Sequence, residues 1–296
     1  MRTLIAASAI TALAVASPVF ADGKNQDHKK STAPSRNDLA PAAPVSAVSG
    51  ASPLAWIDDA TVLAPGTMSF SISAMRWQNG DATEVDVPIA DAAFGLTRRV
   101  QLSASVPRVV DGADAAGGMG TSFFSAKVAL YNDRRRGFKV AAAPTLQIVG
   151  EGVAASLGPD QGRARFGLPA SAEIVDGPIR LYGGGGYFSP GLWFTGAAIA
   201  AQAAEKTFVS VGFSRAWRRS DLPDVSISDR DRKEISGGAA YVLIPGVTIF
   251  GSIGRTINTL PENGAGTSIA GGASFTFGAV KSAFSLRSPL SAIRAM

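Results

Sequence analysis

The sequence contains no cysteine and a single histidine in 296 residues. Without cysteine the fold cannot depend on disulfides, and zinc sites built on thiolates are excluded. The one histidine, His28, lies beside Lys29 and Lys30 in a polar N-terminal segment. Hydrolases that rely on a serine–histidine pair therefore do not fit. We predict that the protein is not an enzyme and holds neither a cofactor nor a metal ion.

Charge is also scarce. Charged residues make up 17% of the chain, below the roughly 25% that is usual in soluble domains. The formal net charge is only +5, and so small an excess, spread over the whole chain, does not indicate a nucleic-acid partner. The basic clusters, among them Arg134-Arg135-Arg136, lie mostly at predicted turns or strand ends, where solvated loop charge is the simpler interpretation.

No uninterrupted apolar run of membrane-helix length follows the N-terminal region. The uncharged segment from Gly183 to Ala201 is long enough, but Pro190 and six glycines favour two strands joined by a turn. Its glycine quartet, Gly183 to Gly186, precedes no helix and is therefore not a nucleotide-binding fingerprint. Glycine inside a strand favours tight curvature or a large neighbouring side chain.

Residues 1–21 predict a secretory signal peptide. Arg2 precedes an apolar run from Leu4 to Val15, and the segment ends on a small residue, Ala21. Export of the chain follows from this prediction.

Residues 22–65 are predicted to be a disordered linker with a possible plug at its end. Up to about residue 53 the segment is polar and proline-rich, so it cannot bury enough apolar surface to offset its ordering entropy. The stretch from Leu54 to Gly66 is more apolar. It is expected either to form a short helix or to lie tucked into the body of the protein.

From Gly66 onward, apolar and small polar residues alternate with a period of two. In the first such segment Phe70 and Ile72 alternate with Ser69 and Ser71. We count about twelve segments, most near the 9–11 residues that cross a bilayer as a tilted strand. Their second face carries Ser, Thr, Gly and Gln rather than the charges of a soluble sheet. Residues 66–277 therefore predict an all-β, transmembrane, antiparallel up-and-down barrel with lipid outside and a lumen inside.

The connections between these segments fall into two classes that alternate along the chain. Tight turns are expected at 97–99, 132–137, 176–178, 203–206 and 245–246. Longer loops are expected at 111–118, 150–162, 218–232 and 258–267, and two short connections, 79–82 and 189–191, are exceptions. Short periplasmic turns opposite long outer loops are typical of outer-membrane barrels. We therefore expect the cell outer membrane as the location, with outer-membrane lipid and the barrel insertion machinery as partners.

Aromatic residues lie near several predicted strand ends, where lipid interfaces attract them. Packing aromatics would give a similar pattern, so both interpretations stay open. The residues are Trp56, Trp77, Trp193, Trp217, Tyr131, Tyr187 and Tyr241.

Five charged residues are predicted to face the lumen on four consecutive strands and are the candidate solute contacts. Glu173 and Arg180 straddle a turn symmetrically, so they are expected to lie opposite each other. Two interpretations stay open: a weakly anion-selective wall that contacts a solute, or a network of ion pairs that fills the barrel. The candidates are Lys127, Lys139, Arg165, Glu173 and Arg180.

Acidic residues elsewhere give no catalytic site. Glu84 and Asp86 share a face of the second segment, and Pro88 and Asp91 indicate a bulge that disturbs the register there. The acidic residues of the loop 218–232 match no EF-hand spacing, so solvated loop charge is favoured.

Two motifs carry a family resemblance. The run from Phe94 to Arg99 (FGLTRR), followed by Val100 to Pro107 (VQLSASVP), resembles the turn and proline-ended strand of a family of outer-membrane barrel transporters. That family includes members associated with meta-pathway phenol degradation. The lysine-bearing segment SFFSAKVALYN around Lys127 is similar to another of its strands. The resemblance covers residues 66–277 and implies a twelve-stranded barrel for passive passage of small, hydrophobic or aromatic molecules.

The chain departs from that pattern at its end. Such barrels usually finish on an aromatic residue that the insertion machinery recognises, whereas residues 278–296 follow Phe277 here as a tail. Two functions are therefore weighed. The first is a passive channel for a small-molecule solute, and the alternative is a structural or surface-interaction barrel that binds a partner through its long loops.

Overall fold

The structure is a computed structural model that describes residues 58–79, 82–111, 117–133, 135–151, 163–189, 191–218, 231–259 and 265–278. The predicted signal peptide, residues 22–57 and the tail beyond residue 278 lie outside this part, as does His28. Within the described ranges, no helix is both long and apolar enough to cross a membrane.

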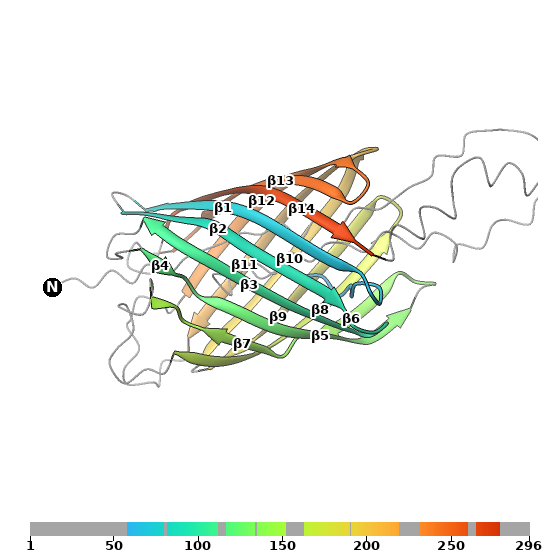
Figure 1. Cartoon of the computed structure of the whole chain (residues 1–296), viewed down its shortest axis with the longest axis horizontal. Helices are drawn as coiled ribbons and strands as arrows, with labels where there is room; N and C mark the ends of the chain where they lie inside the picture. The colour runs from blue at the N-terminus through green and yellow to red at the C-terminus, as the bar shows by residue number, and fades with distance from the viewer. Residues whose placement is uncertain are drawn as a thin grey trace, which may run out of the picture.

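Antiparallel strands close into a tilted barrel (Figure 1). The fourteen β-segments are β1 (Met68–Asn79), β2 (Ala82–Gly95), β3 (Val100–Asp111), β4 (Gly118–Met119), β5 (Ser122–Asp133), β6 (Phe138–Ala142), β7 (Thr145–Ile148), β8 (Ala164–Asp176), β9 (Ile179–Phe188), β10 (Leu192–Ala204), β11 (Thr207–Arg218), β12 (Asp231–Ile244), β13 (Val247–Thr256) and β14 (Thr267–Phe277). Since β4 is a two-residue bridge on β3 and β6 and β7 share one strand position, twelve strands form the wall. The predicted twelve-stranded all-β barrel is confirmed.

The first and last strands meet at the seam. β1 pairs with β14 from Met68 opposite Phe277 to Gln78 opposite Thr267, and β3 pairs directly with β5. Every strand of the wall therefore has a partner on both sides, and closure removes the open edge that would otherwise invite pairing with another chain. The uncharged segment around Gly183 is β9, a turn and β10, not a helix.

The strand shared by β6 and β7 is interrupted at Ala143 and Pro144 without changing its inward face. Both halves pair with β5 and β8. Ala141 before the break and Thr145 after it are both buried in the barrel. Proline has no amide hydrogen for the ladder, which explains why strand pairing stops there.

A bulge on β2 lies where Pro88 predicted it. Ser73 of β1 pairs with Ile89, but Met75 pairs with Asp86, so Val87 and Pro88 together oppose one residue. The extra residue shifts the alternation of faces. Asp86 and Asp91, five positions apart, can thus both point into the barrel, where they are 1% and 7% exposed.

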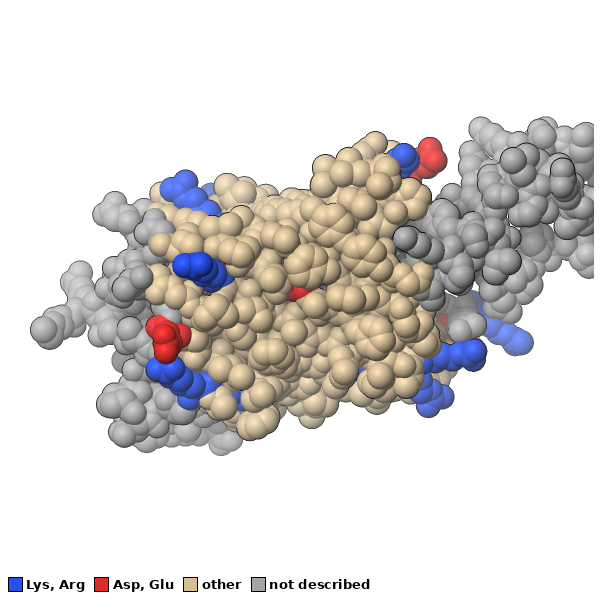
Figure 2. All heavy atoms as spheres, in the orientation of Figure 1, with Lys and Arg blue, Asp and Glu red and all other residues tan. Residues whose placement is uncertain are grey.

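The two faces of the strands differ as expected. On β1, Ile72 is 47% exposed on the outside, whereas Ser71 is 2% exposed on the inside. Figure 2 shows that, on the face in view, charged side chains gather at the two ends of the barrel and the middle is uncharged except for one small acidic spot. A band of this kind suits hydrocarbon, since only closed barrels and helices satisfy their backbone amides there.

Short and long connections sit at opposite ends, as predicted. Turns of two residues join β8 to β9, β10 to β11 and β12 to β13, while the chain from β11 to β12 runs over residues 219–230. Gly177 and Gly246 adopt positive φ values in two of these turns (56° and 83°), a conformation that glycine takes without steric cost.

The aromatic residues divide between the two interpretations, a position near the barrel rim and packing inside the barrel. Trp193 pairs across from Trp217 near the long-loop rim, and Tyr187 packs on Trp193 with ring centroids 5.1 Å apart. Trp77 is only 2% exposed and belongs to the inward face of β1. Trp77 shares the inward face of Ser71, six residues earlier on the strand. The alternation along β1 therefore outweighs the preference of the indole for the lipid interface. Trp56 lies outside the described residues.

Candidate functional site: an ionic network inside the barrel

Residues 58–63, which shortly precede β1, lie inside the barrel. We call residues 58–66 the plug segment; it contains no helix or strand, so the short-helix alternative is wrong for its described part. Leu63 donates its backbone N–H to the Gln101 side chain at 2.9 Å, and Gly66 donates to the Gly95 carbonyl at 2.8 Å. A side chain at Gly95 would collide with the Ala64 carbonyl, so glycine there permits the close approach.

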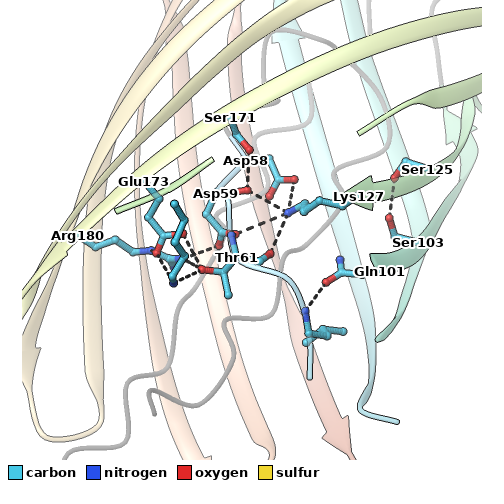
Figure 3. Close-up of polar contacts among 12 residues, drawn as sticks. Asp58, Asp59, Thr61, Gln101, Ser103, Ser125, Lys127, Ser171, Glu173 and Arg180 are labelled. Atoms are coloured by element: carbon cyan, nitrogen blue, oxygen red, sulfur yellow. Dashed lines mark hydrogen bonds and ion pairs between the residues drawn. The ribbon is translucent and has the colours of Figure 1, made fainter. Parts of the chain in front are cut away.

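Two adjacent carboxylates of the plug segment bind cations of the wall (Figure 3). Asp58 Oδ2 lies 2.6 Å from Lys127 Nζ on β5, and Asp59 Oδ2 lies 2.8 Å from Arg180 Nη2 on β9. Asp59 Oδ1 is 3.7 Å from Lys127 Nζ. Asp59 and Lys127 are 0% and 2% exposed, so these pairs are shielded from water.

Glu173 on β8 is the acid that the wall itself contributes. Its Oε1 accepts from Arg180 Nε at 2.7 Å and lies 3.4 Å from Lys139 Nζ on β6. Thr61 connects the plug segment to the same group, because its hydroxyl donates to Glu173 Oε2 at 2.6 Å and accepts from Lys139 Nζ at 2.7 Å.

The predicted register of Glu173 and Arg180 is wrong by two residues. Arg180 pairs across from Val175, and Glu173 pairs across from Tyr182. The turn after β8 contains two residues, Gly177 and Pro178, and this length sets the symmetry centre that the sequence estimate misplaced. The long arginine side chain spans the diagonal and still meets the carboxylate, as cross-strand diagonal pairs can.

Backbone groups of the plug segment complete the network. The Asp59 carbonyl accepts from Lys127 Nζ at 3.1 Å and from the Ser171 hydroxyl at 3.0 Å. The Arg180 guanidinium also lies 5.4 Å from the centre of the Tyr182 ring, a cation–π contact.

The charges of this network balance only when the plug segment is counted. The wall supplies three cations, Lys127, Lys139 and Arg180, and one acid, Glu173, which leaves it with two positive charges. Asp58 and Asp59 supply the two missing negative charges. Buried cations without partners are costly, so the inner wall requires an anion at this level.

The two aspartates respond differently to burial. Burial raises the pKa of Asp58 to about 6, against the opposing effect of Lys127. Burial acts in the same direction on Asp59, but Arg180, Lys127 and Lys139 together outweigh it and lower the pKa of that carboxyl. The neighbouring cations thus keep Asp59 ionised, whereas at Asp58 they do not fully offset the cost of burying the carboxylate.

The structure brings together four of the five predicted lumen residues. Lys127, Lys139, Glu173 and Arg180 share the network. Arg165 lies on the same strand as Glu173 but eight residues away, about 26 Å along the strand, where it pairs across from Gln147 of β7. It is half-buried.

Sequence reasoning missed the plug side of the site. The candidates did not include Asp58, Asp59 and Thr61, because the segment before β1 shows no strand periodicity. The signal was a pair of acids in an otherwise apolar stretch, LAWIDDATVLAPG, with no basic residue beside it. Such a pair needs cations from elsewhere in the fold.

Two further groups line the interior beyond the network. Phe123, Phe188 and Phe194 form an apolar cluster from β5, β9 and β10 in which each side chain is 3% exposed or less. Glu84 and Asp86 are also buried, and Arg232 Nη2 lies 3.4 Å from Glu234 Oε2. Among the residues that the structure describes, no group of three or more acidic or histidine side chains could hold a metal ion.

Comparison with known proteins gives the fold. No family model matches the chain, and no curated protein matches it in sequence. The COG4313 outer membrane channel from Pseudomonas putida F1 is similar in structure, with a TM-score of 0.56, 13% identity and coverage of 74% of this chain and 98% of that one. The NanC porin (TM-score 0.53, 9% identity, 70% and 98% covered) and the KdgM porin (0.51, 9%, 70% and 99%) are similar as well. At such low identity the likeness shows a shared barrel fold.

Proposed function

We propose that the protein is a passive outer-membrane channel for small molecules, held closed in this structure by the plug segment. The observation that carries the proposal is the way the interior is filled. A stable core would be packed with apolar side chains, whereas this barrel holds its own preceding segment through ion pairs and hydrogen bonds. Polar interiors and apolar exteriors characterise membrane barrels that enclose a water-filled path.

The barrel size is compatible with this function. Barrels of about eight strands are filled by their own side chains, and barrels of about 16–18 strands leave wide channels. Twelve strands enclose enough room for one extended segment, which is what residues 58–66 occupy. Departure of that segment would leave a path lined by Ser, Gln and the wall cations. The similar barrels, two porins and an outer membrane channel, support the same function.

The solute is proposed to be small and at least partly apolar. The inward face of the wall carries the aromatic cluster of Phe123, Phe188 and Phe194, which is buried in this closed form. This agrees with the resemblance of the FGLTRR motif to barrels associated with aromatic compounds. A purely hydrophilic pore would have no use for three buried phenylalanines.

Planar-bilayer recording of the full chain tests the channel function. The wild type should show rare openings, and the double variant Asp58→Asn, Asp59→Asn should show frequent ones, because the plug segment then lacks the charges that hold it. Absence of conductance from both proteins, together with no solute uptake in liposomes, would contradict a channel.

That negative result would favour the second function, a structural barrel. The near-complete burial of Lys127, Glu173 and Asp59 is the observation that supports it, since a permanently filled barrel needs such a network. The long-loop residues 219–230 would then be the first to delete in a search for a lost partner interaction.

A further inference from the structure

We propose that Lys127, Lys139 and Arg180 form a binding site for the carboxylate group of a small solute, and that Asp58 and Asp59 occupy this site as internal stand-ins. The site rests on the proposed channel function, because a solute reaches it only inside the barrel. It adds the chemical class of the group that the wall recognises.

The first support is the geometry at Arg180. Its Nε is used by Glu173 at 2.7 Å and its Nη2 by Asp59 at 2.8 Å. Its Nη1 is buried and has no hydrogen-bond acceptor among the described residues. A guanidinium binds a carboxylate best through two parallel N–H groups. Asp59, which is tied to the chain, makes the ion pair through one nitrogen and leaves the other unused.

The second support is the distribution of charge. The wall residues of the network carry two net positive charges, and both compensating carboxylates come from the plug segment. Asp58 is paired through only one of its carboxylate oxygens. Its Oδ2 lies 2.6 Å from Lys127 Nζ, while its Oδ1 is buried without a hydrogen bond. If the cations served only to hold a permanently filled barrel together, the compensating carboxylates could lie on the wall itself, as Glu173 does.

The third support is how the plug segment is held. Residues 58–64 belong to no helix or strand, and they are held in the barrel by side-chain hydrogen bonds, ion pairs, a few backbone contacts near Gly66 and the burial of Ala60 and Leu63. A free carboxylate could therefore replace Asp58 or Asp59 without breaking any strand pairing. The raised pKa of Asp58 agrees with a carboxyl group that is incompletely compensated.

The test measures binding of benzoate to the full chain in detergent micelles by isothermal titration calorimetry. Benzamide, which has the same shape without the charge, is the matched ligand control. Benzoate should bind the double variant Asp58→Asn, Asp59→Asn at least about tenfold more tightly than the wild type, because no internal carboxylate competes. Adding Arg180→Met to that variant should remove the binding, and benzamide should bind none of the proteins.

Heat-dependent migration on gels confirms that each variant is folded. If the double variant does not fold, the single variant Asp58→Asn, which leaves Asp59 on Arg180, takes its place with the same expected order of affinities. Equal binding of benzoate and benzamide, or equal affinity of wild type and folded variant for benzoate, overturns the site.

The result is distinct from the test of the channel. Benzoate binding without conductance would keep the carboxylate site and reject passage through the barrel. Conductance without preferential benzoate binding would keep the channel and reject the site.

Discussion

Replacing Asp58 with Asn should change the pH dependence of the stability of the barrel. Asp58 Oδ2 lies 2.6 Å from Lys127, and its side chain is only 10% exposed. Burial raises its pKa from 3.8 to about 6. Between about pH 4 and pH 6 the native protein therefore holds a proton that the unfolded chain has released, and its unfolding free energy falls as the pH rises.

The size of the effect follows from the pKa difference. A rise from 3.8 to about 6 is about 2 units, and each unit corresponds to about 1.4 kcal/mol, so the loss is about 3 kcal/mol and is complete above about pH 6. Asp59 does not interfere in this window. Its pKa is lowered in the folded state, so its own contribution is lost only below about 3.8.

Equilibrium unfolding in guanidinium, followed by tryptophan emission of the protein in lipid vesicles, measures this difference. The unfolding free energy of the wild type minus that of Asp58→Asn should fall by about 3 kcal/mol between about pH 4 and pH 6.5. Ser171→Ala is the matched control, because it removes the 3.0 Å hydrogen bond to the Asp59 carbonyl without removing a charge. It should lower stability by about 0.5–1.5 kcal/mol with little change across the pH range. A flat or rising difference for Asp58→Asn would refute the reasoning.

Three further predictions use the same unfolding assay. Lys127→Met leaves two buried carboxylates short of a cation and should cost about 3–5 kcal/mol at neutral pH; adding Asp58→Asn should recover part of that loss, and additive costs would contradict the pairing. Ile72→Arg, in the middle of the outer face, should cost about 2–4 kcal/mol in a bilayer, whereas Gln78→Arg near the rim should cost at most about 1 kcal/mol; equal costs would argue against lipid on that face. Gly167→Ala places a methyl group against the Phe188 ring and should cost about 1–3 kcal/mol through overpacking; an unchanged stability would show that the ring moves freely.

The barrel could be predicted from the sequence because each strand carries its own local signal. An alternation such as Ser69, Phe70, Ser71, Ile72 indicates which face of the strand points inside. The places where the alternation stops indicate the turns between strands. The bulge at Pro88 was equally local, since proline cannot donate to the ladder. These signals need no knowledge of what lies across the barrel.

The network could be predicted only in part. Lys127, Glu173 and Arg180 carry the strand pattern, so their inward direction followed from it. Their partners Asp58 and Asp59 lie in a segment without periodicity, and no local sequence pattern predicts that this segment enters the barrel. The register across the turn at Gly177 was mispredicted for a related reason: a shift of two residues leaves every side chain on the same face, so alternation along the strand does not reveal it. Trp77 shows that the face set by alternation outweighs an aromatic preference for the interface.

The attachment of the plug segment to β1 has a consequence for assembly. β1 and β14 form the seam, so the strand that seals the ring is the one that directly follows the plug segment. Thr61 and Arg180, which share a hydrogen bond, are 119 residues apart in the chain. The ion pairs can form only after β5, β8 and β9 stand in the wall. The strand that closes the ring is therefore also the strand whose preceding residues fill it, so closure of the barrel and placement of the plug segment involve the same end of β1.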